Sequence, residues 1–181
     1  MSMPDHVLMA FTEAENIFAS GDIPGAIARI DKALPELEGD VLEADALNNK
    51  GYYLLHLCKW EEAIACFEKA WLIDPSFLAI LNHLAWAALM LGNREGAKAL
   101  MDLFEKQEAD YQALHLRNMA LVYTLDKEGE KALNALIAAE EEDPFMPYMD
   151  ILKRANDGVT PLNAYQEADL QASFLMKLLD L

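Results

Sequence analysis

Cysteine is scarce in this chain of 181 residues. Cys58 and Cys66 are the only two, and they form no Cys-x-x-Cys pair. The sequence therefore lacks a set of thiolate ligands for a structural zinc site. The two cysteines flank an expected turn, on different helices of one hairpin. We expect free thiols packed as small apolar side chains in a reducing cytoplasm, with a disulfide between them as the alternative.

Basic residues are also few. Lysine and arginine number 14 against 31 aspartates and glutamates, which gives a formal net charge of −17. Because the acidic excess runs along the whole chain, we expect no nucleic-acid binding and no docking to an anionic membrane, both of which need clustered cations. A basic or amphipathic protein partner would be attracted instead. The alternative is that the acids only keep an apolar array soluble.

Long hydrophobic runs are missing. The longest nearly apolar stretch, residues 78–91, is interrupted by Asn82 and His83 and is too short to cross a bilayer. The first residues carry no basic region followed by an apolar one, as a secretory signal would. We therefore expect no membrane insertion and a cytoplasmic location.

Motifs of catalysis are absent as well. The sequence contains no glycine-rich phosphate loop, no His-Glu-x-x-His run and no Gly-x-Ser-x-Gly elbow. The histidines have no adjoining nucleophile or metal-ligand pattern; they are His6, His56, His83 and His115. We expect a protein that is not an enzyme, with no catalytic residue, metal ligand or cofactor. An enzyme or regulator with a site assembled on the surface is the alternative from another class.

What the sequence does contain is a recurring helical pattern. Ala63, Ala97 and Ala132 lie in similar short segments, 34 and then 35 residues apart. A period of this length predicts stacked helical hairpins. In the clearest copy, residues 44–77, small residues let two helices approach closely while Phe67 fills the space between them. The positions that carry the pattern are Leu47, Gly51, Leu54, Ala63, Phe67, Ala70 and Pro75.

This pattern resembles the tetratricopeptide repeat. Weaker copies cover residues 78–111 and 113–146, and a degenerate one covers residues 7–40, with extra residues expected around 34–40. The resemblance implies an all-α fold: a right-handed superhelical array of antiparallel helix pairs, or α-solenoid. It comprises about four hairpins and capping helices over residues 147–181, in a single domain 1–181. An irregular helical bundle is the competing interpretation.

One copy departs from the pattern. In residues 78–111, Phe104 stands where a small alanine is usual, and Ala109 stands where proline would be. A bulky ring at a close helix contact changes the distance between helices. We expect the packing there to differ from the rest of the array.

In the family that this chain resembles, the first helix of each hairpin lines a concave groove that binds a peptide or protein segment. Asparagine amides there can hold a peptide backbone, and aromatic rings can bury an apolar side chain, although such rings can equally belong to the core. The groove residues expected from the resemblance are Asn48, Tyr52, His56, Asn82, Trp86, Met90, Arg117 and Leu121. This implies a non-enzymatic scaffold or adaptor, with a secretion-type chaperone that holds an exported partner as the alternative.

The last segment is unusually apolar. Pro144 and Pro147 are expected to open one helix, and Thr160-Pro161 to cap and begin a final helix that ends near Leu179. A helix exposed on one side should carry a polar stripe, which this one lacks. We expect it either to fold back toward the groove or to form a homodimer contact. The stripe proposed for self-association is Leu170, Phe174 and Leu178.

Overall fold

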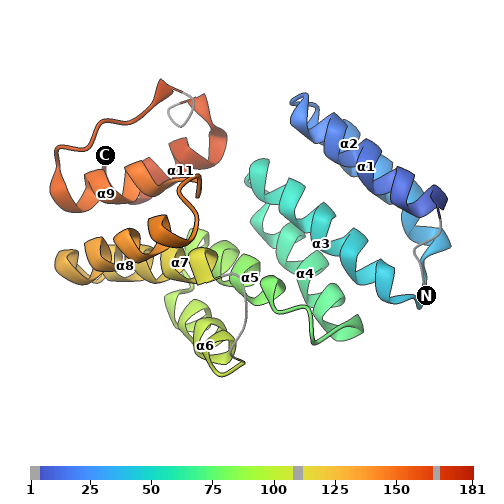
Figure 1. Ribbon diagram of the computed structural model, residues 1–181, viewed down its shortest axis with the longest axis horizontal. Coiled ribbons are helices and arrows are strands. Elements are labelled where there is room, and N and C mark those ends of the chain that lie inside the picture. Colours follow the sequence, from blue (N-terminus) through green and yellow to red (C-terminus); the bar gives the residue numbers. More distant parts are fainter. Residues whose placement is uncertain (1–4, 108–111, 165–167) are drawn as a thin grey trace. The chain divides into compact units, whose positions relative to one another are not determined.

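The computed structural model describes residues 5–107, 112–164 and 168–181 (Figure 1). Every regular element in these ranges is a helix, so the all-α class predicted from the sequence is confirmed. The chain divides into two compact units, unit 1 (Met1–Ile80) and unit 2 (Leu81–Leu181). The expectation of a single continuous domain over residues 1–181 stays a prediction.

Unit 1 consists of two helical hairpins. Its helices are α1 (Asp5–Ala19), α2 (Ile23–Ala33), α3 (Val41–His56) and α4 (Trp60–Ile73). α1 pairs with α2 and α3 pairs with α4, while α2 also packs on α3 (Figure 1). The extra residues of the degenerate first copy form the 3-10 turn η1 (Leu34–Glu36) and a left-handed turn at Gly39, with φ 81°. This confirms where the sequence places them.

Short polar side chains fix where these helices begin. The Asp22 carboxylate accepts the backbone N–H of Gly25 at 2.9 Å, and the Asp40 carboxylate accepts that of Leu42 at 2.9 Å. Each bond satisfies a backbone donor that has no partner within the first turn of a helix. The loops between helices can therefore be short, and each hairpin closes tightly.

The contact between α3 and α4 depends on one glycine. A Cβ atom built on Gly51 would lie 2.6 Å from Cε1 of Phe67, whose side chain is completely buried. Glycine within a helix costs about 0.5 to 1 kcal/mol relative to alanine. Its presence here is explained by the space that the Phe67 ring takes, as the repeat pattern predicts.

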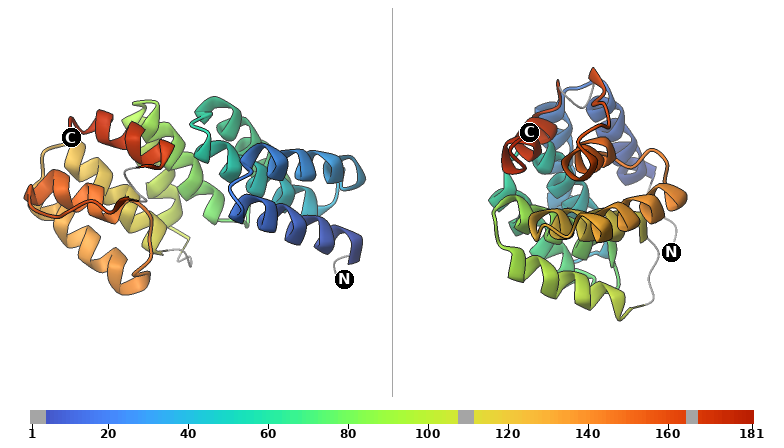
Figure 2. Two further views of the ribbon diagram at one scale, coloured as in Figure 1. Left: turned by 90° about the horizontal axis from the view of Figure 1, so that it is seen from above. Right: turned by 90° about the vertical axis from the view of Figure 1, so that its left-hand side faces the viewer.

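Unit 2 contains the remaining helices. They are α5 (Ala79–Met90), which begins just before the unit does, α6 (Arg94–Glu105), α7 (Gln112–Leu125), α8 (Gly129–Glu142), α9 (Met149–Asp157) and α11 (Leu170–Leu178). α7 pairs with α8, α9 packs against both, and α11 contacts α9 (Figures 1 and 2). The predicted hairpin of residues 113–146 is thus present as α7 and α8, and Ala109 lies outside the described residues.

The start of α9 differs from the prediction that Pro144 and Pro147 open it. Tyr148 has a left-handed backbone, with φ 70°, so the helix begins only at Met149. Before it, the Asp143 carboxylate accepts the N–H of Phe145 at 2.9 Å and holds the chain in a turn. The turn carries Tyr148 into the interior of unit 2, where its side chain is buried.

The prediction that Thr160-Pro161 begins the final helix is wrong. Residues 159–163 are not helical. The Asp157 carboxylate accepts the N–H groups of Val159 and Thr160, at 2.9 and 3.0 Å, and the Thr160 hydroxyl at 2.5 Å. Because this turn uses the hydroxyl as a donor, Thr160 does not cap a helix. Asp169 caps α11 instead, accepting the N–H of Ala172 at 2.9 Å.

Substitution of Gly51 by alanine tests the close contact between α3 and α4. The added methyl group overlaps the Phe67 ring, so we expect Gly51→Ala to lower the free energy of unfolding by about 1 to 3 kcal/mol. Urea unfolding followed by circular dichroism measures this. Gly129→Ala is the matched control, because its Cβ would lie 3.4 Å from the nearest atom, Oδ1 of Asn156. Equal stabilities of the two variants would contradict the contact.

Candidate functional site

The groove residues predicted in unit 1 lie beside an aromatic ring from α1. Asn48 is buried, and Tyr52 and His56 are half-buried. The Phe18 ring lies 5.7 Å from that of Tyr52 and 4.9 Å from that of His56. Phe18 was not predicted, because nothing in α1 alone indicates which rings of α3 it meets.

Trp86 is the centre of the predicted groove in unit 2. Its side chain, on α5, is 1% exposed. The Tyr148 ring stacks on the indole with centroids 5.6 Å apart and planes 9° from parallel. The guanidinium carbon of Arg117, on α7, lies 4.1 Å from the centre of the indole, within range for a cation–π interaction. We call the surface formed by Trp86, Arg117 and Tyr148 the Trp86 face.

Helix α11 covers the Trp86 face. The indole N–H of Trp86 donates to Oε1 of Gln171 at 3.2 Å, and the hydroxyl of Tyr148 donates to Oδ1 of Asp169 at 3.3 Å. Ala172 and Leu175 of α11 are completely buried. The predicted self-association stripe lies on other sides of this helix: Leu170 is 55% exposed, and Phe174 and Leu178 are half-buried.

Polar groups surround Arg117 beneath this face. Its Nη2 donates to Oδ1 of Asn118 at 3.2 Å, and Nδ2 of Asn118 donates to the backbone oxygen of Asn82 at 2.9 Å. The amide of Asn82 is completely buried, with no hydrogen-bond partner among the residues that the structure describes. Burial, and then the positive charge of Arg117, lower the pKa of His83 to about 4. His83 is therefore neutral at pH 7 and adds no second cation.

The structure thus brings Trp86 and Arg117 together. Met90 and Leu121 are also buried within unit 2. The role of the eight predicted groove residues in binding a partner stays a prediction. Tyr148 and Gln171 were missed by the sequence analysis.

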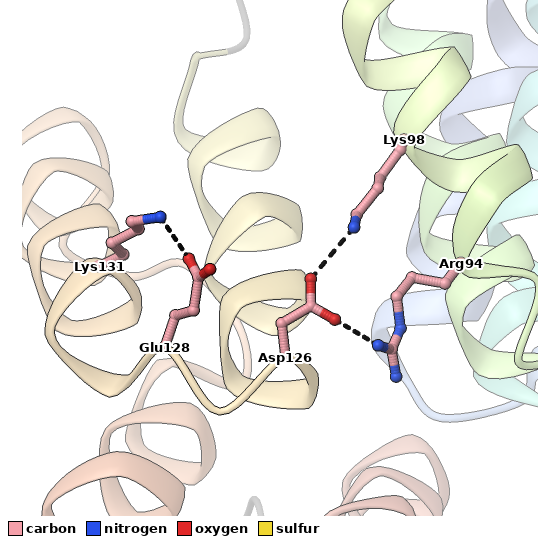
Figure 3. Close-up of polar contacts among 5 residues, drawn as sticks. All are labelled: Arg94, Lys98, Asp126, Glu128 and Lys131. Atoms are coloured by element: carbon pink, nitrogen blue, oxygen red, sulfur yellow. Dashed lines mark hydrogen bonds and ion pairs between the residues drawn. The ribbon is translucent and has the colours of Figure 1, made fainter.

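A second polar cluster joins α6 to the turn between α7 and α8 (Figure 3). The Asp126 carboxylate accepts hydrogen bonds from Arg94 and from Nζ of Lys98, the latter at 3.1 Å. The hydrogen bond from Lys98 and the charges of both cations hold the pKa of Asp126 below its usual range. Beside it, Nζ of Lys131 pairs with Glu128 at 2.6 Å.

Other kinds of site find no support in the described ranges. They contain no group of three or more histidine, cysteine or acidic side chains placed to hold a metal ion. None of their helices has both the length and the apolar character that a membrane span needs. Neither Cys58 nor Cys66 is in a disulfide bond, and burial raises the pKa of Cys66.

Substitution of Gln171 tests how α11 is held. Gln171→Leu keeps the volume of the side chain but leaves the buried indole N–H of Trp86 unpaired, which costs about 1 to 3 kcal/mol. We expect amide hydrogen exchange in α11 to become at least about tenfold faster. Lys177→Leu, at an exposed position of the same helix, should leave exchange unchanged. Native protection in Gln171→Leu would show that the hydrogen bond does not hold α11.

Substitution of Asp126 tests the polar junction. Because its folded-state pKa is lowered, the carboxylate stabilises the fold above the unfolded-state value of about 4, and this stabilisation is lost as pH falls through the folded-state pKa. We expect Asp126→Asn to lower the free energy of unfolding at pH 7 by up to about 1 kcal/mol, and the difference to shrink as pH falls below about 4. Thermal unfolding between pH 7 and 3 measures this, with Asp102→Asn, exposed on α6, as control. A constant difference would contradict the ionic origin.

Comparison with known proteins agrees with the geometry. Residues 44–77 match the family model described as tetratricopeptide repeat. No curated protein matches the chain. Among solved structures, MamA from Desulfovibrio magneticus RS-1 is 16% identical with a TM-score of 0.63, and the match covers 99% of this chain and 96% of that one. A tetratricopeptide repeat protein from Parabacteroides merdae is 15% identical with a TM-score of 0.61, over 97% of this chain and 66% of that one.

A further similar structure is that of YrrB, a tetratricopeptide-repeat protein described as having an unusual peptide-binding site. It is 19% identical to this chain with a TM-score of 0.56, and the match covers 94% of this chain and 82% of YrrB. At such identities the likeness concerns the fold, and the repeat itself rests on the family model. Residues 44–77 are therefore a tetratricopeptide repeat, and the chain around them has the fold of the tetratricopeptide-repeat proteins.

Proposed function

We propose that this protein is a non-enzymatic interaction module that binds a partner's helical segment on the Trp86 face, in place of α11. The observation that supports this most is the hydrogen bond between Trp86 and Gln171. It belongs to a surface that already accommodates a short helix of the same chain. A fold used for protein interaction, with YrrB described as a peptide-binding relative in structure, supports the same class of ligand.

The chemistry of the Trp86 face indicates what the partner segment carries. α11 buries Ala172 and Leu175 against the rest of unit 2, and its Gln171 offers one amide oxygen to the indole N–H. A competing segment therefore needs an apolar stripe interrupted by one hydrogen-bond acceptor. The Arg117 guanidinium beside the indole also favours an acceptor over a donor there.

The affinity of α11 for this face is limited by its length. It has 9 residues, and an isolated helix shorter than about 12 residues is marginal in water. Docking of α11 on the Trp86 face is favoured because α11 belongs to the same chain, which gives it a high effective concentration at this face. A partner with a longer amphipathic helix starts without that advantage but buries more surface. Exchange between the two is therefore the expected mode of binding.

A labelled peptide of residues 168–181 tests this proposal without a known partner. In the full-length variant Ala172→Asp, a charge at a completely buried position undocks the protein's own α11. We expect the peptide to bind this variant at least about tenfold more tightly than the native protein, as measured by fluorescence anisotropy.

Two controls make the result specific. Leu170→Asp changes an exposed position of the same helix and should leave the native affinity unchanged. A peptide that carries Gln171→Leu should bind Ala172→Asp about tenfold more weakly than the natural peptide. Equal binding of the natural peptide to the native protein and to both variants would contradict exchange at the Trp86 face.

Two further predictions from the sequence can be tested with the same variants and peptide. If Leu170, Phe174 and Leu178 form a homodimer contact, Leu170→Asp lowers the mass measured by light scattering. A chaperone that holds an unfolded segment would use the same face for a partner that becomes helical on binding. The mass and the peptide affinity are separate measurements, so each prediction is tested by itself.

A further inference from the structure

A cavity of about 490 Å³ lies within unit 2, apart from the Trp86 face. Its walls come from three helices. The side chains that matter are Glu105 of α6, His115, Leu116, Met119 and Tyr123 of α7, and Lys131 of α8. The volume falls in the range of ligand-binding pockets.

Phe104, which departs from the repeat pattern, packs against one residue of the cavity wall. Its side chain is buried at the contact of α6 with α7, and its ring stacks on His115 with centroids 5.1 Å apart. A ring where the repeat usually has a methyl group increases the distance between two helices. The expectation that the packing at Phe104 differs from the rest of the array stays a prediction.

The polar end of the cavity contains a buried ring nitrogen of His115 without a hydrogen-bond partner among the described residues. The His115 side chain is 5% exposed, and its Nε2 lies 3.0 Å from Oε1 of Glu105. A neutral imidazole that donates Nε2–H to the carboxylate leaves Nδ1 as an acceptor. Nδ1 is buried and has no hydrogen-bond partner among the described residues. A buried acceptor of this kind is unfavourable unless a ligand donates to it.

The charges around the cavity favour a cation. Glu105 is 57% exposed, so its carboxylate can accept further hydrogen bonds. Lys131, the one cation among the described residues of the wall, is already paired with Glu128 at 2.6 Å (Figure 3). With that pair neutral as a whole, Glu105 leaves the cavity with a net negative charge. The net charge of −17 on the whole chain adds a long-range attraction for cations.

We propose that this cavity binds a lysine or arginine side chain of a partner protein. The aliphatic stem lies along Leu116 and Met119, and the cationic head donates to the Glu105 carboxylate, beside the His115 ring. Basic side chains combine an apolar stem with a charged head, and the walls of this cavity divide in the same way. The site does not involve α11, so it is independent of the function proposed for the Trp86 face.

Nuclear magnetic resonance on the full-length, ¹⁵N-labelled protein tests this site. The probes are N-acetyl-arginine amide and N-acetyl-lysine amide, with N-acetyl-norleucine amide as an uncharged analogue of the stem. We expect the two basic probes to shift amide signals of residues 115–123 and the Nδ1 signal of His115. The norleucine probe should bind at least about tenfold more weakly.

Matched variants separate the cavity from general attraction to an acidic protein. Glu105→Gln removes the carboxylate and should raise the dissociation constant of both basic probes at least about tenfold. Glu95→Gln, at an exposed position of α6 outside the cavity wall, removes the same charge. It should change the dissociation constant of the basic probes less than about twofold. Equal effects of the two variants, or an unmoved His115 Nδ1 signal at saturation, would overturn the proposal.

Discussion

The candidate site depends on the burial of the Trp86 indole. A ring of this size stabilises the fold by roughly 2 to 3 kcal/mol when it is removed from water. Its N–H then needs a partner, because a buried unpaired donor removes much of that gain. Gln171 supplies the acceptor from α11, 85 residues further along the chain. The final helix is therefore part of the environment of the Trp86 face as well as the end of the array.

The repeated hairpins could be predicted from the sequence because their contacts are local and periodic. Gly51 and Phe67 meet within one hairpin, and the spacing of their residue types is visible in the sequence. The surroundings of Trp86 could not be predicted in the same way. Tyr148, which stacks on the indole, has a left-handed backbone, and the sequence gives no signal for that conformation.

The start of the final helix could not be predicted from its capping pattern, because a nearby carboxylate binds the Thr160 hydroxyl. Thr160-Pro161 has the composition of a helix start, but the Asp157 carboxylate takes the Thr160 hydroxyl first. The helix consequently begins after Asp169, and the stripe that it buries includes Gln171 and Leu175.

Departures from the repeat pattern coincide with the two places proposed to bind ligands. Phe104 adds a ring where the pattern has a methyl group, and the proposed basic side-chain site lies beside it. The largely apolar α11 departs from an ordinary exposed helix, and it covers the Trp86 face. Function in this protein is therefore sought where the repeats are irregular, while their regular positions maintain the fold.

The indole N–H signal of Trp86 gives the most direct measurement of whether α11 covers this face. Burial of the indole under α11 predicts slow hydrogen exchange of that signal in the native protein and exchange faster by tenfold or more in Ala172→Asp. Fast exchange of the Trp86 indole in the native protein, equal to that in Ala172→Asp, would show that α11 does not occupy the face.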